Sequence, residues 1–197
     1  MPIDLDFSQH AILVCALTFN NKKYVDQSSN SLQNSWGKIL LDSKPYSFSG
    51  MNYYSKEMGN GLLKKLIVFE THIPLYSLYE KKLCAIEIEK QLATKTSETE
   101  MKRNINIDPG LLTSGSLVLS STKYSPHRIP IGPGIFAETT LLYEKGIYKP
   151  LPWTYLDYKN ELVQETLLRA RSWLKKTEKS QLIHRNSRIS FRSNRNQ

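Results

Sequence analysis

The apolar positions of the chain fall into short continuous runs and into stripes with helical spacing. A short apolar run bounded by turn residues is typical of a buried strand, and apolar residues three and four positions apart indicate a helix with one buried face. In the first half of the chain these patterns predict a strand, a helix, two strands, a helix and a strand. Their ranges are 11–19, 25–36, 38–41, 62–71, 74–93 and 102–107.

Three details refine these elements. Gly37 stands where a helix ends in a residue of positive φ, and the strand over 38–41 can continue over residues 45–48. Pro74 suits the first turn of the second helix. The apolar stripe predicted to form the buried face of that helix consists of Leu75, Leu78, Tyr79, Leu83 and Ile86.

The second half of the chain begins with Asp108-Pro109-Gly110, a sequence that favours a turn. Residues 111–121 are ambiguous, because Leu117-Val118-Leu119 fits either a strand or a short buried helix. A meander of antiparallel strands is predicted over residues 127–131, 135–143 and 147–151. Asp157 can then cap a last helix. Its buried stripe is Val163, Leu167, Ala170 and Leu174, and Glu165 can pair with Arg169 on its outer face.

The order of the first six elements is that of the split βαβ arrangement in ferredoxin-like domains. We therefore expect an α+β fold in which two helices cover one face of an antiparallel or mixed sheet, extended by the C-terminal β-meander and helix. A length of 197 residues fits one domain better than two. We assign residues 1–176 to this domain and residues 177–197 to a basic disordered tail, because the helical period stops after Lys176.

Charge and composition narrow the class of protein. The net charge is +9, of which the stretch from Thr177 onward contributes +4, and such a stretch adds attraction to phosphate backbones or only aids solubility. No apolar run approaches the roughly 20 residues that cross a bilayer, and Asp4 and Asp6 stand where a signal peptide carries positive charge. Cys15 and Cys84 lie in apolar patterns and are expected to pack rather than to form a disulfide. We expect a cytoplasmic protein without a membrane segment.

Several familiar sites are missing from the sequence. Gly37-Lys38 is followed by Ile39 and lacks the glycine five positions earlier, so it is not a phosphate-binding P-loop. The chain has no Gly-x-Ser-x-Gly and no Cys-x-x-Cys, and its four histidines have no zinc-binding spacing. P-loop nucleotidases, serine hydrolases of this type and zinc sites are therefore not indicated.

The polar candidates lie mostly between residues 104 and 158. Thr122, Lys123, His127 and Arg128 combine a hydroxyl, an ammonium, an imidazole and a guanidinium group before a turn, a set that suits an anion. The alternative is an exposed loop with ordinary surface charges. His127 can also shuttle a proton in catalysis.

Two carboxylates have both a catalytic and a structural interpretation. Asp108, close to Asn106 at a strand end, can serve as a metal ligand or base, or can bond its own backbone in a turn. Glu138 lies on a strand with apolar neighbours, so its carboxylate needs a partner, and Arg128 on the neighbouring strand is the expected one. The alternative role for Glu138 is a catalytic acid.

Aromatic residues supply candidate ring-binding positions. Trp153, Tyr155 and Tyr158 can stack on a base or other ring, or can seal the last helix onto the sheet. Tyr53, Tyr54 and Glu57 lie in a long glycine-rich connection over residues 49–61, and long ordered loops often bind ligands.

These motifs occur together, in this order, in one known family. The segments that carry the resemblance are Tyr53–Gly59, Asn106–Gly110, Thr122-Lys123, His127–Ile129 and Pro150–Tyr158. From about Ala11 to Leu174 the chain resembles the bacterial and archaeal family called domain of unknown function 4416 (DUF4416). Its members are sometimes labelled GTP-binding, which implies a guanine nucleotide as one candidate ligand. However, Thr122-Lys123-Tyr124-Ser125 lacks the aspartate of a guanine-binding Asn/Thr-Lys-x-Asp element.

Three functions remain open on the sequence alone. The first is a binding module for a phosphorylated small molecule, a nucleotide or RNA, with Lys123, His127 and Arg128 on the anion and Tyr53, Trp153 or Tyr155 on a ring. The second is an enzyme acting on a phosphate or carboxylate substrate, with His127 as acid or base and Asp108 or Glu138 beside it. The third is a structural or partner-binding protein. The first two require that the segments around residues 53, 108, 127 and 153 converge on one cationic cleft.

Overall fold

The computed structural model of the chain describes residues 10–48, 54, 57–97 and 100–193, with the backbone alone for His10 and residues 179–193. The predicted Tyr53 lies outside the described residues. In chain order the elements are β1 (His10–Phe19), α1 (Lys22–Trp36), β2 (Ile39–Asp42), β3 (Tyr46–Ser47), β4 (Leu63–Pro74), the 3-10 helix η1 (Leu75–Ser77), α3 (Leu78–Gln91), β5 (Thr94–Lys95), β6 (Met101–Lys102), β7 (Ile105–Leu112), β8 (Ser116–Ser121), β9 (Ile129–Gly132), β10 (Ile135–Glu144), β11 (Ile147–Pro150), the 3-10 helix η2 (Leu156–Lys159) and α4 (Glu161–Ser193).

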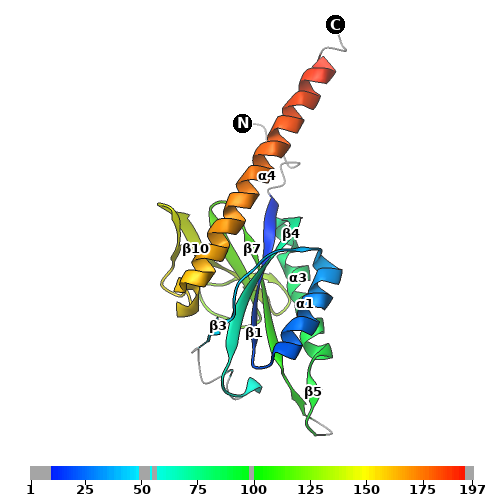
Figure 1. Ribbon diagram of the computed structural model, residues 1–197, viewed down its shortest axis with the longest axis vertical. Helices are drawn as coiled ribbons and strands as arrows, with labels where there is room; N and C mark the ends of the chain where they lie inside the picture. Colours follow the sequence, from blue (N-terminus) through cyan, green and yellow to red (C-terminus); the bar gives the residue numbers. More distant parts are fainter. Residues whose placement is uncertain (1–9, 49–53, 55–56, 98–99, 194–197) are drawn as a thin grey trace.

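The described strands build one large antiparallel sheet and one small hairpin. The order across the large sheet is β11-β10-β8-β7-β1-β4-β2, with β3 added beside β4 and β9 beside β10, and β5 pairs with β6. Helices α1 and α3 lie on one side of the sheet, and α4 crosses the other side and extends beyond it (Figure 1). The α+β class is therefore confirmed, and the sheet carries helices on both faces.

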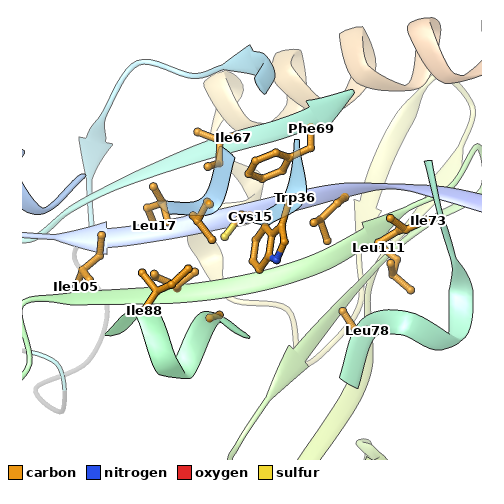
Figure 2. Packing of buried hydrophobic residues seen from close by; sticks show 14 of the residues in the cluster. Cys15, Leu17, Trp36, Ile67, Phe69, Ile73, Leu78, Ile88, Ile105 and Leu111 are labelled. Atoms are coloured by element: carbon orange, nitrogen blue, oxygen red, sulfur yellow. The ribbon is translucent and has the colours of Figure 1, made fainter. Parts of the chain in front are cut away.

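The first face of the sheet packs against α1 and α3. Alternate residues of β1, including Cys15 and Leu17, meet Trp36 of α1 and Leu78 of α3 in a cluster of fully or nearly fully buried side chains (Figure 2). Trp36 and Phe69 pack edge to face with ring centroids 5.4 Å apart. Since β1 is buried on both faces, its nine-residue apolar run needs no polar alternation.

The second face packs against α4. The predicted stripe of Val163, Leu167, Ala170 and Leu174 is fully buried against the other set of alternate β1 residues, Ile12, Val14 and Ala16. The pair between Glu165 and Arg169 is also present, with 3.7 Å between nitrogen and oxygen. The helix continues past Lys176, where the sequence pattern predicts its end, to Ser193.

The predicted turn at Asp108-Pro109-Gly110 is wrong. These three residues lie inside β7, where Asp108 pairs with Ala16 and Pro109 with Cys15 of β1. Gly110 is required there, because a Cβ would lie 2.5 Å from Leu119 Cδ2 and 2.8 Å from the Val118 carbonyl oxygen. The ambiguous stretch that follows forms the end of β7 and the strand β8.

Two details of the helices also differ from the prediction. Leu75 and Leu83 are exposed, while α3 buries Leu78, Lys82, Ala85, Ile88 and Glu89, so its inner face is rotated from the predicted stripe. Asp157 does not cap the last helix. The side chain of Asn160 instead accepts a hydrogen bond from Leu162 N, at 2.9 Å.

Two further predictions concern the cysteine thiols and a membrane-spanning segment. Cys15 is buried, Cys84 is half-buried, and both are free thiols. Within the described ranges, no helix has both the length and the apolar character that a bilayer crossing demands.

Candidate functional site

Strands β7 and β8 are paired along only part of their length. Gly110, Leu111 and Leu112 pair with Leu119, Val118 and Leu117, and the described ladder between the two strands begins at Gly110. Pro109 has no N–H to donate, so a strand partner on this side would gain nothing from its nitrogen. Residues 105–109 of β7 therefore present an edge that β8 does not cover.

Side chains, rather than a neighbouring strand, provide the hydrogen-bond partners for the backbone groups of this open edge. Ile107 N donates to Glu89 Oε1 at 2.6 Å, and the Ile107 carbonyl accepts from Lys82 Nζ at 2.8 Å. The Pro109 carbonyl accepts from Ser120 Oγ at 2.8 Å. Buried backbone groups need such partners, and here the partners are ionisable or hydroxyl side chains at the point where the two strands separate.

The side chain of Lys82 also reaches a residue on the other face of the sheet. Its ammonium nitrogen lies 2.9 Å from Asp108 Oδ1, and the Asn106 amide donates to Asp108 Oδ2 at 2.6 Å. Burial alone would raise the pKa of Asp108, but the charges of Lys82 and Lys64 and the hydrogen bonds from Lys82 and Asn106 hold it below its usual value. Asp108 is thus a paired carboxylate in the folded chain.

Arg103 completes the network beside β7. Its guanidinium donates to Glu89 Oε2 at 2.6 Å, to Asn106 Oδ1, and to Glu57 Oε2 at 3.4 Å. Burial raises the pKa of Glu89, although Lys82, Arg103 and the Ile107 N–H act in the opposite direction. The predicted ligand residue Glu57 is therefore engaged by Arg103.

A cleft opens on the α4 side of this network. It lies between the open edge of β7 and the end of β8, and the loop after β8 and η2 also border it. The cleft has a volume of about 80 Å³, several times the roughly 10–15 Å³ that one water needs. A small ligand group fits this space.

Lys64 forms the wall of the cleft opposite β7. It lies on β4 beside Thr18 of β1, and Thr18 in turn pairs with Asn106, so the three side chains follow one row across the sheet. Lys64 Nζ lies 2.5 Å from Asp157 Oδ2, and both side chains are less than a tenth exposed. Its ammonium also lies 4.7 Å from the centre of the Tyr158 ring. This pair ties η2, just before α4, to the sheet.

The predicted pair of Arg128 and Glu138 is present on the β8 side. Arg128 Nε donates to Glu138 Oε2 at 2.6 Å, which agrees with the structural interpretation of this carboxylate. Arg128 Nη1 also donates to Ser121 Oγ and to the Lys123 carbonyl, at 2.9 and 2.7 Å. Much of the guanidinium therefore holds the loop after β8 in place.

His127 lies next to the same carboxylate. Its Nε2 is 3.2 Å from Glu138 Oε2, and its Nδ1 is 3.0 Å from Ser125 Oγ. The imidazole ring stacks on Trp153, with centroids 4.9 Å apart and 14° between the planes. The indole N–H of Trp153 donates to the Thr139 carbonyl at 2.9 Å, so this ring is fixed as well.

The remaining predicted residues lie around the cleft. Asn106, Asp108, Thr122, Lys123, Arg128, Glu138, Tyr54 and Tyr155 line it, whereas His127 and Trp153 do not. Lys123 Nζ is 4.9 Å from the Tyr54 ring centre, and burial lowers the pKa of Lys123. Burial, with Asp108 as a smaller cause, raises the pKa of Tyr54 well above its usual value. Four distant segments of the chain thus meet at one place.

Three charged lining residues were missed by the sequence analysis. They are Lys64, Lys82 and Arg103, with Glu89 and Asp157 as their partners. One signal was available, because Leu78, Lys82, Ala85 and Glu89 form a helical stripe in which two charged residues occupy buried positions. No group of three or more histidine, cysteine, aspartate or glutamate side chains among the described residues is arranged to hold a metal ion.

Fold and site together define an α+β protein with a polar cleft at an open strand edge. The family model described as Domain of unknown function (DUF4416) matches residues 9–173, which include all the described strands and the whole cleft. The chain belongs to this family, and the resemblance drawn from its motifs is confirmed. No curated protein and no solved structure matches the chain.

Proposed function

We propose that the cleft binds a small phosphorylated ligand and that the protein is a binding module for it. The observation that carries this proposal is the lining of the cleft. Among the described residues, five cationic side chains and two carboxylates line it. The cations are Lys64, Lys82, Arg103, Lys123 and Arg128. Lysine and arginine are the usual partners of phosphate groups in proteins.

The cations are held in position before a ligand arrives. Carboxylates pair with four of them, in the pairs Lys64–Asp157, Lys82–Asp108, Arg103–Glu89 and Arg128–Glu138. An ammonium group has three N–H donors, so a lysine in an ion pair can still donate to an anion. Fixed donors in a partly desolvated cleft lower the ordering cost of binding. The carboxylates also favour a ligand that adds hydroxyl or amine donors to its phosphate.

A melting experiment with matched variants tests this proposal. Ribose 5-phosphate serves as the probe, because it combines a phosphate with hydroxyl groups. At about one hundred times its dissociation constant a ligand adds roughly 2.7 kcal/mol to the stability of the folded chain, and we expect a corresponding rise in melting temperature. Lys123→Ala should reduce the rise, and Lys175→Ala, at an exposed position of α4, should leave it unchanged. A rise that survives Lys123→Ala in full argues against the cleft.

The contact between His127 and Glu138 keeps an enzymatic function as a second candidate. A histidine beside a carboxylate is a common acid–base arrangement. However, both ring nitrogens lie at hydrogen-bond distance from protein side chains, and His127 is not among the residues that line the cleft. These contacts are explained more simply if His127 serves to hold Trp153 and Glu138 in place. An acid–base role requires that His127→Gln abolish turnover of a phosphate ester that the protein binds.

Three further expectations belong with this proposal. The strand order β7-β1-β4-β2, with α1 and α3 on one face, supports a ferredoxin-like core that β8 to β11 extend. The two free cysteines support a cytoplasmic location. If RNA rather than a small molecule is the ligand, the basic stretch after Thr177 supplies additional attraction to its backbone.

A further inference from the structure

A second hollow adjoins the cleft at Phe48 and Tyr155, which line both. We call it the aromatic groove, and its other walls include Trp153, Leu156 and Tyr46. Trp153 and Tyr155 are each more than a third exposed, and Leu156 is 76% exposed. Large apolar side chains in a concave surface beside a charged cleft favour a ligand with a planar ring.

The exposed ring of Trp153 is held rigidly. His127 covers one of its faces, and its indole N–H is bonded to the Thr139 carbonyl. The side chain therefore loses little conformational freedom when a ligand ring packs against it. Aromatic side chains presented in this way form stacking surfaces for nucleobases.

Two buried polar atoms belong to residues that line this groove. Tyr46 Oη and Asp157 Oδ1 have no hydrogen-bond partner among the residues that the structure describes. Tyr46 is 7% exposed and the Asp157 side chain 8%. A phenol donates and a carboxylate accepts, so a group with an acceptor beside an N–H donor satisfies both. Buried polar atoms without partners are rare in folded proteins and call for such an explanation.

We propose that the aromatic groove is a base-binding subsite and that the ligand of the protein is a mononucleotide. This inference rests on the proposed function, because it places the phosphate in the cleft and the base in the groove. A nucleobase has a flat apolar face for Trp153 and Tyr155, and an edge on which N–H donors adjoin acceptors. That edge contacts Tyr46 and Asp157 after a small side-chain shift or through one bridging water.

Isothermal titration of the full chain with matched probes tests the subsite. The probes are ribose 5-phosphate, the four nucleoside 5′-monophosphates and a six-residue oligoribonucleotide. We expect at least one monophosphate to bind about tenfold more tightly than ribose 5-phosphate, because stacking on an aromatic side chain is worth about that much. Trp153→Leu should remove most of this advantage and leave ribose 5-phosphate binding largely intact, because Trp153 lines the groove and not the cleft.

Tyr46→Phe is the sharpest variant, since it removes only the hydroxyl group. It should weaken nucleotide binding about fivefold without lowering the melting temperature of the free chain, because the hydroxyl has no described partner to lose. Tyr148→Phe is the matched control. Tyr148 is also buried, but its hydroxyl donates to the Thr113 carbonyl at 2.8 Å, so this change should destabilise the free chain and leave binding unchanged.

The outcomes separate the two proposals. If no phosphate-bearing probe binds, the proposed function is wrong and the subsite with it. If ribose 5-phosphate and all four monophosphates bind with equal affinity, the base-binding subsite is wrong and the proposed function stands. The same conclusion follows if Tyr46→Phe keeps the full affinity for nucleotides. If the oligoribonucleotide binds more tightly than every monophosphate, the groove is a binding site for RNA, and the proposal of a mononucleotide ligand is wrong.

Discussion

Lys82 Nζ lies 2.9 Å from Asp108 Oδ1, although the two residues belong to opposite sides of the sheet. Lys82 comes from α3, which packs on the first face, whereas Asp108 pairs with Ala16 and shares the second face with it. The lysine reaches the carboxylate where β8 no longer covers β7. This one ion pair therefore joins the helix layer, the open strand edge and the floor of the cleft.

Removing the cation of this pair should destabilise the protein. Lys82→Met leaves the Asp108 charge and the Ile107 carbonyl without their partner in a largely buried site. We expect a loss of about 3 kcal/mol in the free energy of unfolding, measured by urea titration. Lys90→Met breaks the exposed pair with Glu87 and should cost at most about 0.5 kcal/mol. Equal urea midpoints for Lys82→Met and wild type contradict the importance of the pair.

The same pair gives the protein a defined response to acid. Although burial alone would raise it, the pKa of Asp108 is lowered in the folded chain by Lys82, Lys64 and two hydrogen bonds. A folded-state pKa below the unfolded value of about 3.9 adds stability above that pH, and this stability is lost as the pH falls through the folded-state pKa.

A comparison with Asp108→Asn isolates this response. The wild type should exceed the variant in stability by the largest amount between about pH 5 and 7, and the difference should shrink below about pH 4. Glu89 acts with the opposite sign because burial raises its pKa, so the difference between the two proteins is the useful quantity. Urea midpoints at several pH values provide it. A difference that is constant from pH 7 to pH 3 contradicts the assignment to Asp108.

Gly110 should be sensitive to the smallest substitution. Gly110→Ala places a methyl group against Leu119 and the Val118 backbone, and such overpacking costs about 1–3 kcal/mol. Gly115→Ala is the matched control, because a Cβ there has nothing within 4 Å and the backbone is not in the positive-φ region. The control should be neutral or slightly stabilising. Calorimetric melting of the two variants measures the contrast, and similar melting temperatures contradict the close approach of β7 and β8.

Arg128 and Glu138 should behave as one structural unit. Each side chain is less than a tenth exposed, so changing either one leaves a buried charge, at a cost of about 3–5 kcal/mol. In a double-mutant cycle with Arg128→Met and Glu138→Leu, the double variant should be more stable than the sum of the single effects predicts, by about 0.5–3 kcal/mol. Additive effects mean that the two residues act independently.

The elements that sequence predicts well are those whose burial follows a local period. The apolar run of β1 and the stripe from Val163 to Leu174 in α4 are both completely buried. The meander strands are also found near their predicted positions, with Gly134 and Gly146 in the turns at positive φ. In these segments the local pattern and the tertiary environment agree.

The site residues that sequence misses are those whose role depends on distant contacts. Asp108-Pro109-Gly110 has the composition of a turn, but Pro109 lies where no strand needs its N–H and Gly110 lies where only hydrogen fits. Lys82 and Glu89 interrupt an apolar stripe because their partners are backbone groups of β7, 18 to 25 residues away along the chain. Such pairings are set by the separation of β7 and β8, which no local pattern encodes.

The most direct test of the central claim is a crystal structure of the protein with ribose 5-phosphate. The account predicts a phosphate group in the cleft between β7 and β8, with its phosphorus within about 4 Å of Lys123 Nζ, the distance that a hydrogen bond to a phosphate oxygen implies. A phosphate bound elsewhere on the molecule, with only solvent between Lys123 and Asp108, contradicts it.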